Sequence, residues 1–75
     1  MEHSISVLDG TGDTRLTWNE DNTDEVAAAR KLFDDLRAKR FIAYTVTGKG
    51  EKGEMIERFD PTAEKIILSP PMRGG

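Results

Sequence analysis

Two stretches of the sequence contain residue types that could do chemistry, and in each the spacing limits what that chemistry is. Residues 48–53, Gly-Lys-Gly-Glu-Lys-Gly, have the composition of a phosphate loop. They lack its Gly-x-x-x-x-Gly-Lys-Ser/Thr spacing and the helix that must follow it. Residues 9–13 place two carboxylates beside glycines, without the alternating oxygen ligands and closing glutamate of a calcium loop. Both stretches are therefore predicted to be turns, and we expect no metal and no cofactor.

The sequence also lacks the groups that nucleophilic catalysis needs. It has one histidine, His3, and no cysteine, and no serine is placed to work with the histidine. No acid, base and nucleophile converge, so we expect that the protein is not an enzyme. We expect His3 to lie on the surface of a strand.

Size and charge narrow the classes of partner. The 75 residues suffice for one domain with a modest core. Eleven basic and 14 acidic residues give a net charge of −3, and the basic residues are scattered, so nucleic acid is not expected as a partner. No apolar run approaches the roughly 18–20 residues that span a bilayer. We expect a monomer that binds other proteins, and the absence of cysteine is compatible with a cytoplasmic location.

Hydrophobic periodicity predicts six elements. Alternating residues, such as Ile5 and Val7, indicate half-buried strands, and Val26, Ala29, Phe33 and Leu36 follow the spacing of an amphipathic helix. The predicted elements are one helix at 23–39 and strands at 3–8, 14–18, 41–46, 54–59 and 65–69.

The residue types also predict where the helix begins and which side chains lie in the core. Asn22 or Thr23 is a suitable N-cap, and Glu25 stands three residues after Asn22, as in a capping box. Trp18 and Phe33 are expected in the core. The element order β-β-α-β-β-β predicts an α+β fold in which one helix covers one face of a sheet.

The domain is expected to end at residue 69. Residues 1–69 form a single domain, and residues 70–75 form a flexible tail, because two prolines favour polyproline geometry and two glycines favour none. Only residues 60–64 separate the last two predicted strands. An antiparallel three-strand meander after the helix therefore remains open as an alternative topology.

Element order, chain length and the ending Arg73-Gly74-Gly75 are similar to those of ubiquitin-like β-grasp proteins, the class of ubiquitin and the bacterial sulfur carriers. In sequence the resemblance is confined to these last three residues, and Pro70 and Pro71 depart from the leucine and basic residues usual there. The resemblance implies a mixed sheet whose last strand runs parallel beside its first.

The resemblance also implies a chemistry for the tail. In that family an E1-like enzyme uses ATP to adenylate the C-terminal carboxylate, and the acyl group passes to a thiol, an amine or sulfide. Here Gly75 is then the reacting residue, Gly74 provides clearance because it has no Cβ, and Arg73 offers a polar handle to the partner. The resemblance thus predicts a protein modifier or a sulfur carrier.

The strand at 41–46 is apolar on both faces, although a single helix can cover only one face of a sheet. We expect the other face to expose an apolar patch for binding a protein partner. Parity alone does not say which set of residues faces the helix. The alternative function is therefore a non-covalent interaction or assembly module, whose predicted binding face comprises Ile42, Tyr44, Val46, Ile56 and Ile67.

Overall fold

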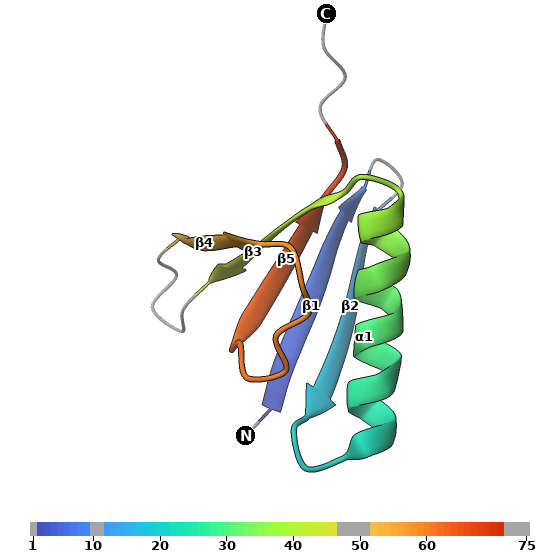
Figure 1. Cartoon of the computed structure of the whole chain (residues 1–75), viewed down its shortest axis with the longest axis vertical. Helices are drawn as coiled ribbons and strands as arrows, with labels where there is room; N and C mark the ends of the chain where they lie inside the picture. The colour runs from blue at the N-terminus through green and yellow to red at the C-terminus, as the bar shows by residue number, and fades with distance from the viewer. Residues whose placement is uncertain (1, 10–11, 47–51, 72–75) are drawn as a thin grey trace, which may run out of the picture.

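One helix lies against one face of a five-stranded sheet (Figure 1). The computed structural model describes residues 2–9, 12–46 and 52–71. This arrangement confirms the α+β class and the predicted order of elements. The elements are β1 (Glu2–Asp9), β2 (Gly12–Asn19), α1 (Thr23–Ala38), β3 (Ile42–Val46), β4 (Lys52–Ile56) and β5 (Lys65–Ser69).

The strands form a mixed sheet in the order β2-β1-β5-β3-β4. β1 is antiparallel to β2 and parallel to β5, with Ile5 opposite Ile66 and Val7 opposite Leu68. β3 lies between β5 and β4 and is antiparallel to both. The meander alternative is wrong, because β5 is inserted between β1 and β3 and is not a neighbour of β4.

The connection from β4 to β5 explains why β4 is displaced from its predicted position. β4 was expected at 54–59 but ends at Ile56. Because β4 and β5 are both antiparallel to β3, they run in the same direction, and the chain must travel back along the sheet between them. Residues 57–64 make this return, and Phe59 leaves the strand pattern to pack against the core.

The core lies between the helix and one face of the sheet. Trp18 and Phe33 are both fully buried, as predicted, and the Phe59 ring contacts both, with centroid distances of 5.2 Å to Trp18 and 5.8 Å to Phe33. Alternate residues of each strand point to this face because the side-chain period of a strand is two. The buried apolar residues are Ile5, Val7, Trp18, Ala29, Phe33, Ala43, Ile66 and Leu68.

The N-terminus of α1 is capped by side chains on both sides of its boundary. The Asn22 side-chain oxygen accepts hydrogen bonds from the backbone N–H groups of Asp24 (3.1 Å) and Glu25 (3.2 Å), so Asn22 is the N-cap. The Glu25 carboxylate instead accepts from the backbone N–H of Asn19 at 2.8 Å. The predicted capping box is therefore only half formed. In a full box Glu25 would accept from the N–H of Asn22, but here it accepts from the N–H of Asn19, the last residue of β2.

The C-terminus of α1 has two hydrogen bonds that close the last turn. The N–H of Phe41 donates to the carbonyl of Leu36 at 3.0 Å, and the N–H of Arg40 donates to that of Arg37 at 2.9 Å. This is the Schellman pattern, in which the residue after the cap adopts a left-handed conformation. That residue is Arg40, with φ of 70°, at a position that favours glycine.

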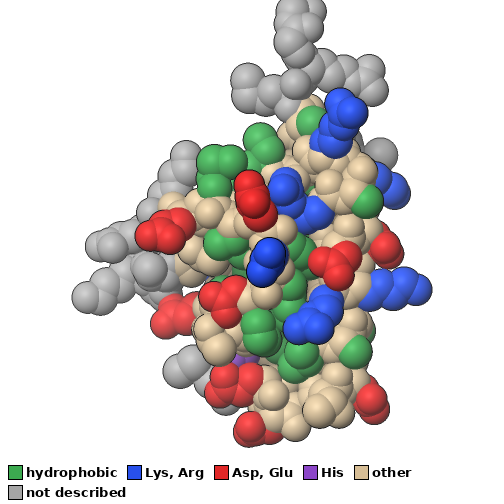
Figure 2. Space-filling view, viewed as in Figure 1, with side chains coloured by type: hydrophobic (Ala, Val, Ile, Leu, Met, Phe, Trp, Pro, Cys, Tyr) green, Lys and Arg blue, Asp and Glu red, His purple; other side chains and the backbone are tan. Residues whose placement is uncertain are grey.

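Charge is unevenly distributed over the face shown in Figure 2. Acidic side chains predominate at the end of the molecule opposite the end of β5, and basic side chains gather toward the end where β5 finishes. The helix of the described residues is neither long nor apolar enough to cross a membrane.

Candidate functional site

The predicted reactive tail leaves the body of the protein from a central strand. β5 ends at Ser69, which pairs with Ile42 at the start of β3, and Pro70 and Pro71 follow as exposed residues. The predicted site residues Arg73, Gly74 and Gly75 lie outside the described residues. The described residues therefore show only where the segment after β5 begins, which is between β1 and β3.

The sheet face that points away from the helix carries an apolar cluster. We call it the far face, and Tyr44 lies at its centre, opposite Ile67 on β5 and Met55 on β4. The structure therefore brings four of the five predicted face residues together. The far face consists of Leu8, Ile42, Tyr44, Val46, Met55 and Ile67.

The prediction for Ile56 is wrong. Ile56 pairs with Ala43, which is buried, and packs against the core, so it points to the helix side of the sheet. Its neighbour Met55 takes the position on the far face. A shift of one residue in the register of β4 exchanges the two faces, and parity within the sequence could not fix that register.

Exposure on the far face is unequal. Met55 is 72% exposed and Leu8 39%, and these are the large apolar side chains that stand out into solvent among the described residues. Ile42, Tyr44, Val46 and Ile67 are half-buried, although the helix does not cover them. The expected patch therefore exists in reduced form, with Met55 as its most accessible member.

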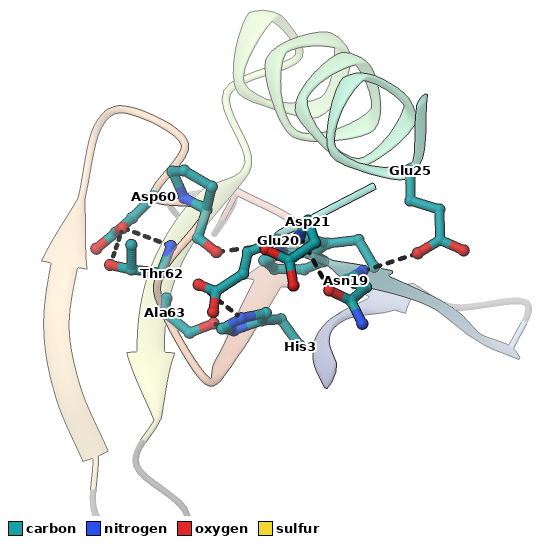
Figure 3. Close-up of polar contacts among 10 residues, drawn as sticks. His3, Asn19, Glu20, Asp21, Glu25, Asp60, Thr62 and Ala63 are labelled. Carbon is teal, nitrogen blue, oxygen red and sulfur yellow. Dashed lines mark hydrogen bonds and ion pairs between the residues drawn. The ribbon is translucent and has the colours of Figure 1, made fainter. Parts of the chain in front are cut away.

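The most organised polar cluster surrounds His3, which is only 2% exposed, so its predicted surface position is wrong (Figure 3). His3 lies opposite Trp18 in the sheet, and the two rings stack with centroids 5.3 Å apart and planes 17° apart. The Nδ1 atom lies 2.7 Å from the carbonyl oxygen of Ala63, and Nε2 lies 3.5 Å from the Glu20 carboxylate. Sequence reasoning missed this cluster, although the alternation that places Ile5 and Val7 in the core places His3 on the same face.

The same cluster holds the loop at 57–64 to the first two strands. The indole N–H of Trp18 donates to the carbonyl of Pro61 at 3.1 Å. The backbone N–H of Ser4 donates to the carbonyl of Glu64 at 3.2 Å. The loop contains the predicted turn at Asp60, where the N–H of Ala63 donates to the Asp60 carbonyl at 3.2 Å.

Asp60 stabilises this turn through its side chain. Its carboxylate accepts hydrogen bonds from the Thr62 hydroxyl (2.6 Å) and from the Thr62 backbone N–H (2.9 Å). These two bonds lower the pKa of Asp60 below its ordinary value, and a smaller contribution in the same direction comes from the charge of His3. Burial opposes the shift.

The His3 cluster is suited to holding structure, not to contacting a substrate. The ring is enclosed by Trp18, Ala63 and Glu20, so a molecule in solvent has no route to its nitrogens. In the described ranges 2–9, 12–46 and 52–71, no group of three or more histidine or acidic side chains could hold a metal ion.

An open groove of about 550 Å³ runs along the outer side of α1 and was not predicted. Its lining includes the apolar Val26 and Ala27 and the charged Glu20, Arg30 and Asp34. Arg30 also lies over the Phe59 ring, with its guanidinium carbon 6.0 Å from the centroid. Because the lining carries charges of both signs, the groove has no preference for one class of charged ligand.

Comparison with known proteins found no matching family model, no matching curated protein and no matching solved structure.

Proposed function

We propose that the protein is a ubiquitin-like modifier or sulfur carrier of β-grasp type, activated at the carboxylate of Gly75 by an E1-like adenylating enzyme. The observation that carries the proposal is the parallel pairing of β5 with β1, in a sheet covered by one helix. The resemblance of the sequence to that class implied this pairing, and it excludes the meander that was its rival. The ending Arg73-Gly74-Gly75 supports the same class.

The position of β5 suits delivery of the tail to an enzyme. A segment that follows Ser69 starts beside β1 and β3, next to the far face, so a partner gripping the tail can also contact the body of the protein. A six-residue segment in polyproline geometry reaches about 18 Å, at about 3 Å per residue. That length allows a carboxylate to enter a narrow site while the domain stays outside it.

The proposed chemistry belongs to the partner enzyme. A carboxylate oxygen of Gly75 attacks the α-phosphorus of ATP, and pyrophosphate leaves. A thiolate or sulfide then attacks the acyl carbon, and AMP leaves with the bonding electrons. Gly74 and Gly75 present no Cβ to the walls of such a site, so the backbone can approach the nucleotide closely.

The test is incubation with ATP and a set of E1-like enzymes of both the modifier-activating and the sulfur-transferring kind. We expect mass spectrometry to detect an acyl-adenylate, a thioester or a thiocarboxylate at Gly75. Deletion of Gly75 should abolish the product, whereas Glu54→Ala, an exposed change on β4, should leave it unchanged. An unmodified terminus with every enzyme in the set would overturn the proposal.

The second candidate is a non-covalent interaction module that binds through the far face. The exposure of Met55 favours it, because Met55 lies opposite Tyr44 on the far face, and an exposed apolar side chain that extends an apolar surface is typical of binding surfaces. Deletion of Gly74 and Gly75 should then leave binding intact, while Met55→Asp and Tyr44→Asp abolish it. Loss of binding on deletion of the two glycines, with Met55→Asp neutral, would return the assignment to the tail.

A further inference from the structure

The first step concerns which nitrogen of His3 carries the ring proton. A backbone carbonyl oxygen can only accept a hydrogen bond, and the carbonyl of Ala63 lies 2.7 Å from Nδ1. Nδ1 must therefore carry a proton and donate it. In the neutral ring, which has a single N–H, Nε2 is then left with a bare lone pair.

The second step concerns the surroundings of that lone pair. Nε2 is fully buried and has no hydrogen-bond partner within the described structure, and the nearest charge is the Glu20 carboxylate, with Oε2 at 3.5 Å. The unprotonated Nε2 and the Glu20 carboxylate oxygen are both acceptors, so no hydrogen bond can form between them. When Nε2 takes up a proton, the same pair becomes a cationic donor beside an anion.

Two acidic side chains of the described residues interact with a charge on His3. The Glu20 carboxylate, in the connection between β2 and α1, lies 3.5 Å from Nε2, and the charge of His3 helps to lower the pKa of Asp60 in the loop at 57–64. Trp18 of β2 covers one side of the ring with its own ring. This environment offers the imidazolium two anions.

We infer that His3 and Glu20 form a proton-dependent clasp that fastens the loop at 57–64 to the start of the sheet. The neutral ring holds Ala63 alone, and the protonated ring holds Ala63 and Glu20 together. The clasp joins three segments that are distant in sequence: β1, the connection before α1, and the loop that carries Phe59 into the core. The Glu20 link is present while the imidazole carries its second proton on Nε2 and is lost when the rising pH removes that proton.

The chain is well suited to a direct test because it contains one histidine and one tryptophan, and they are stacked. We expect nitrogen NMR of the imidazole at pH 8.5 to show the Nδ1–H tautomer in the wild-type protein. Detection of the Nε2–H tautomer would overturn the inference. This measurement needs no variant, so it does not depend on a substitution that folds.

A second measurement separates a proton-dependent role from a purely structural one. Glu20 is 45% exposed, so Glu20→Gln should fold, and Asp21→Asn removes the same charge from the neighbouring exposed residue as a matched control. We expect Glu20→Gln to raise the unfolding equilibrium constant about five-fold at pH 5.5 and less than two-fold at pH 8.5. Asp21→Asn should change the unfolding equilibrium constant by the same factor at both pH values. Equal ratios for Glu20→Gln at the two pH values would refute the clasp.

Discussion

Replacing Arg40 by glycine should stabilise the protein, although it removes a charged side chain from the end of a helix. Arg40 has a φ of 70° and an exposed side chain, and its N–H closes the last turn of α1. A residue with a Cβ in this left-handed conformation costs about 1–2 kcal/mol. Glycine avoids that strain but has more freedom in the unfolded chain, which costs about 0.4–1 kcal/mol.

The net effect of Arg40→Gly is a gain of about 0.5–1 kcal/mol in the free energy of unfolding. In a domain of this size that gain corresponds to a rise in Tm of about 2–8 °C. Thermal and urea unfolding, followed by circular dichroism and by Trp18 fluorescence, would measure it. Lys39→Gly is the matched control, because Lys39 has φ of −89°, where glycine relieves no strain and should lower stability by about 0.5–1 kcal/mol. If Arg40→Gly were no more stable than wild type, the strain assigned to this position would be absent.

Three further changes test the packing and the turn. Gly53→Ala should destabilise by about 1–3 kcal/mol in urea unfolding, because a Cβ there collides with the carbonyl and hydroxyl of Thr45 on β3. Phe33→Ala should cost about 3–5 kcal/mol by the same assay and Phe33→Leu under about 1.5, since the site is fully buried. The folded pKa of Asp60 is lowered, so its carboxylate stabilises the protein above the ordinary pKa of about 4 and this contribution is lost as pH falls further. Asp60→Asn should therefore be less stable than wild type at pH 6, and the difference should shrink as the pH falls below about 4; a difference independent of pH would contradict the role given to Thr62.

The position of β5 shows where sequence reasoning ended. Its residues, centred on Ile66 and Leu68, are apolar enough to predict a strand, and only five residues seemed to separate it from the strand before. A hairpin and a crossover were both compatible with that spacing. The choice depends on pairing with β1, about 60 residues away, where Ile5 and Ile66 come together in the core. No local pattern encodes such a contact.

Some residues of the candidate site could be placed from local sequence patterns, and others could not. Ile42, Tyr44, Val46 and Ile67 share a face because alternation along each strand and the pairing of β3 with β5 agree. Ile56 was misplaced because the register of β4 depends on the bulge opposite Thr45, which Gly53 makes room for. His3 was misplaced because a polar residue was expected to seek solvent. Its burial depends on the acceptor supplied by the Ala63 carbonyl and on stacking with Trp18, which the fold brings from other parts of the chain.

The sequence by itself determined the elements of this protein: the helix through its apolar spacing and the Asn22 cap, and the strands through alternation. These signals are local, since each depends on residues within a few positions of one another. The tertiary structure decided the strand order, the identity of the far face and the enclosure of His3. Each of those depends on which distant segments meet, and that is decided by the burial of Trp18, Phe33 and Phe59 in one shared core.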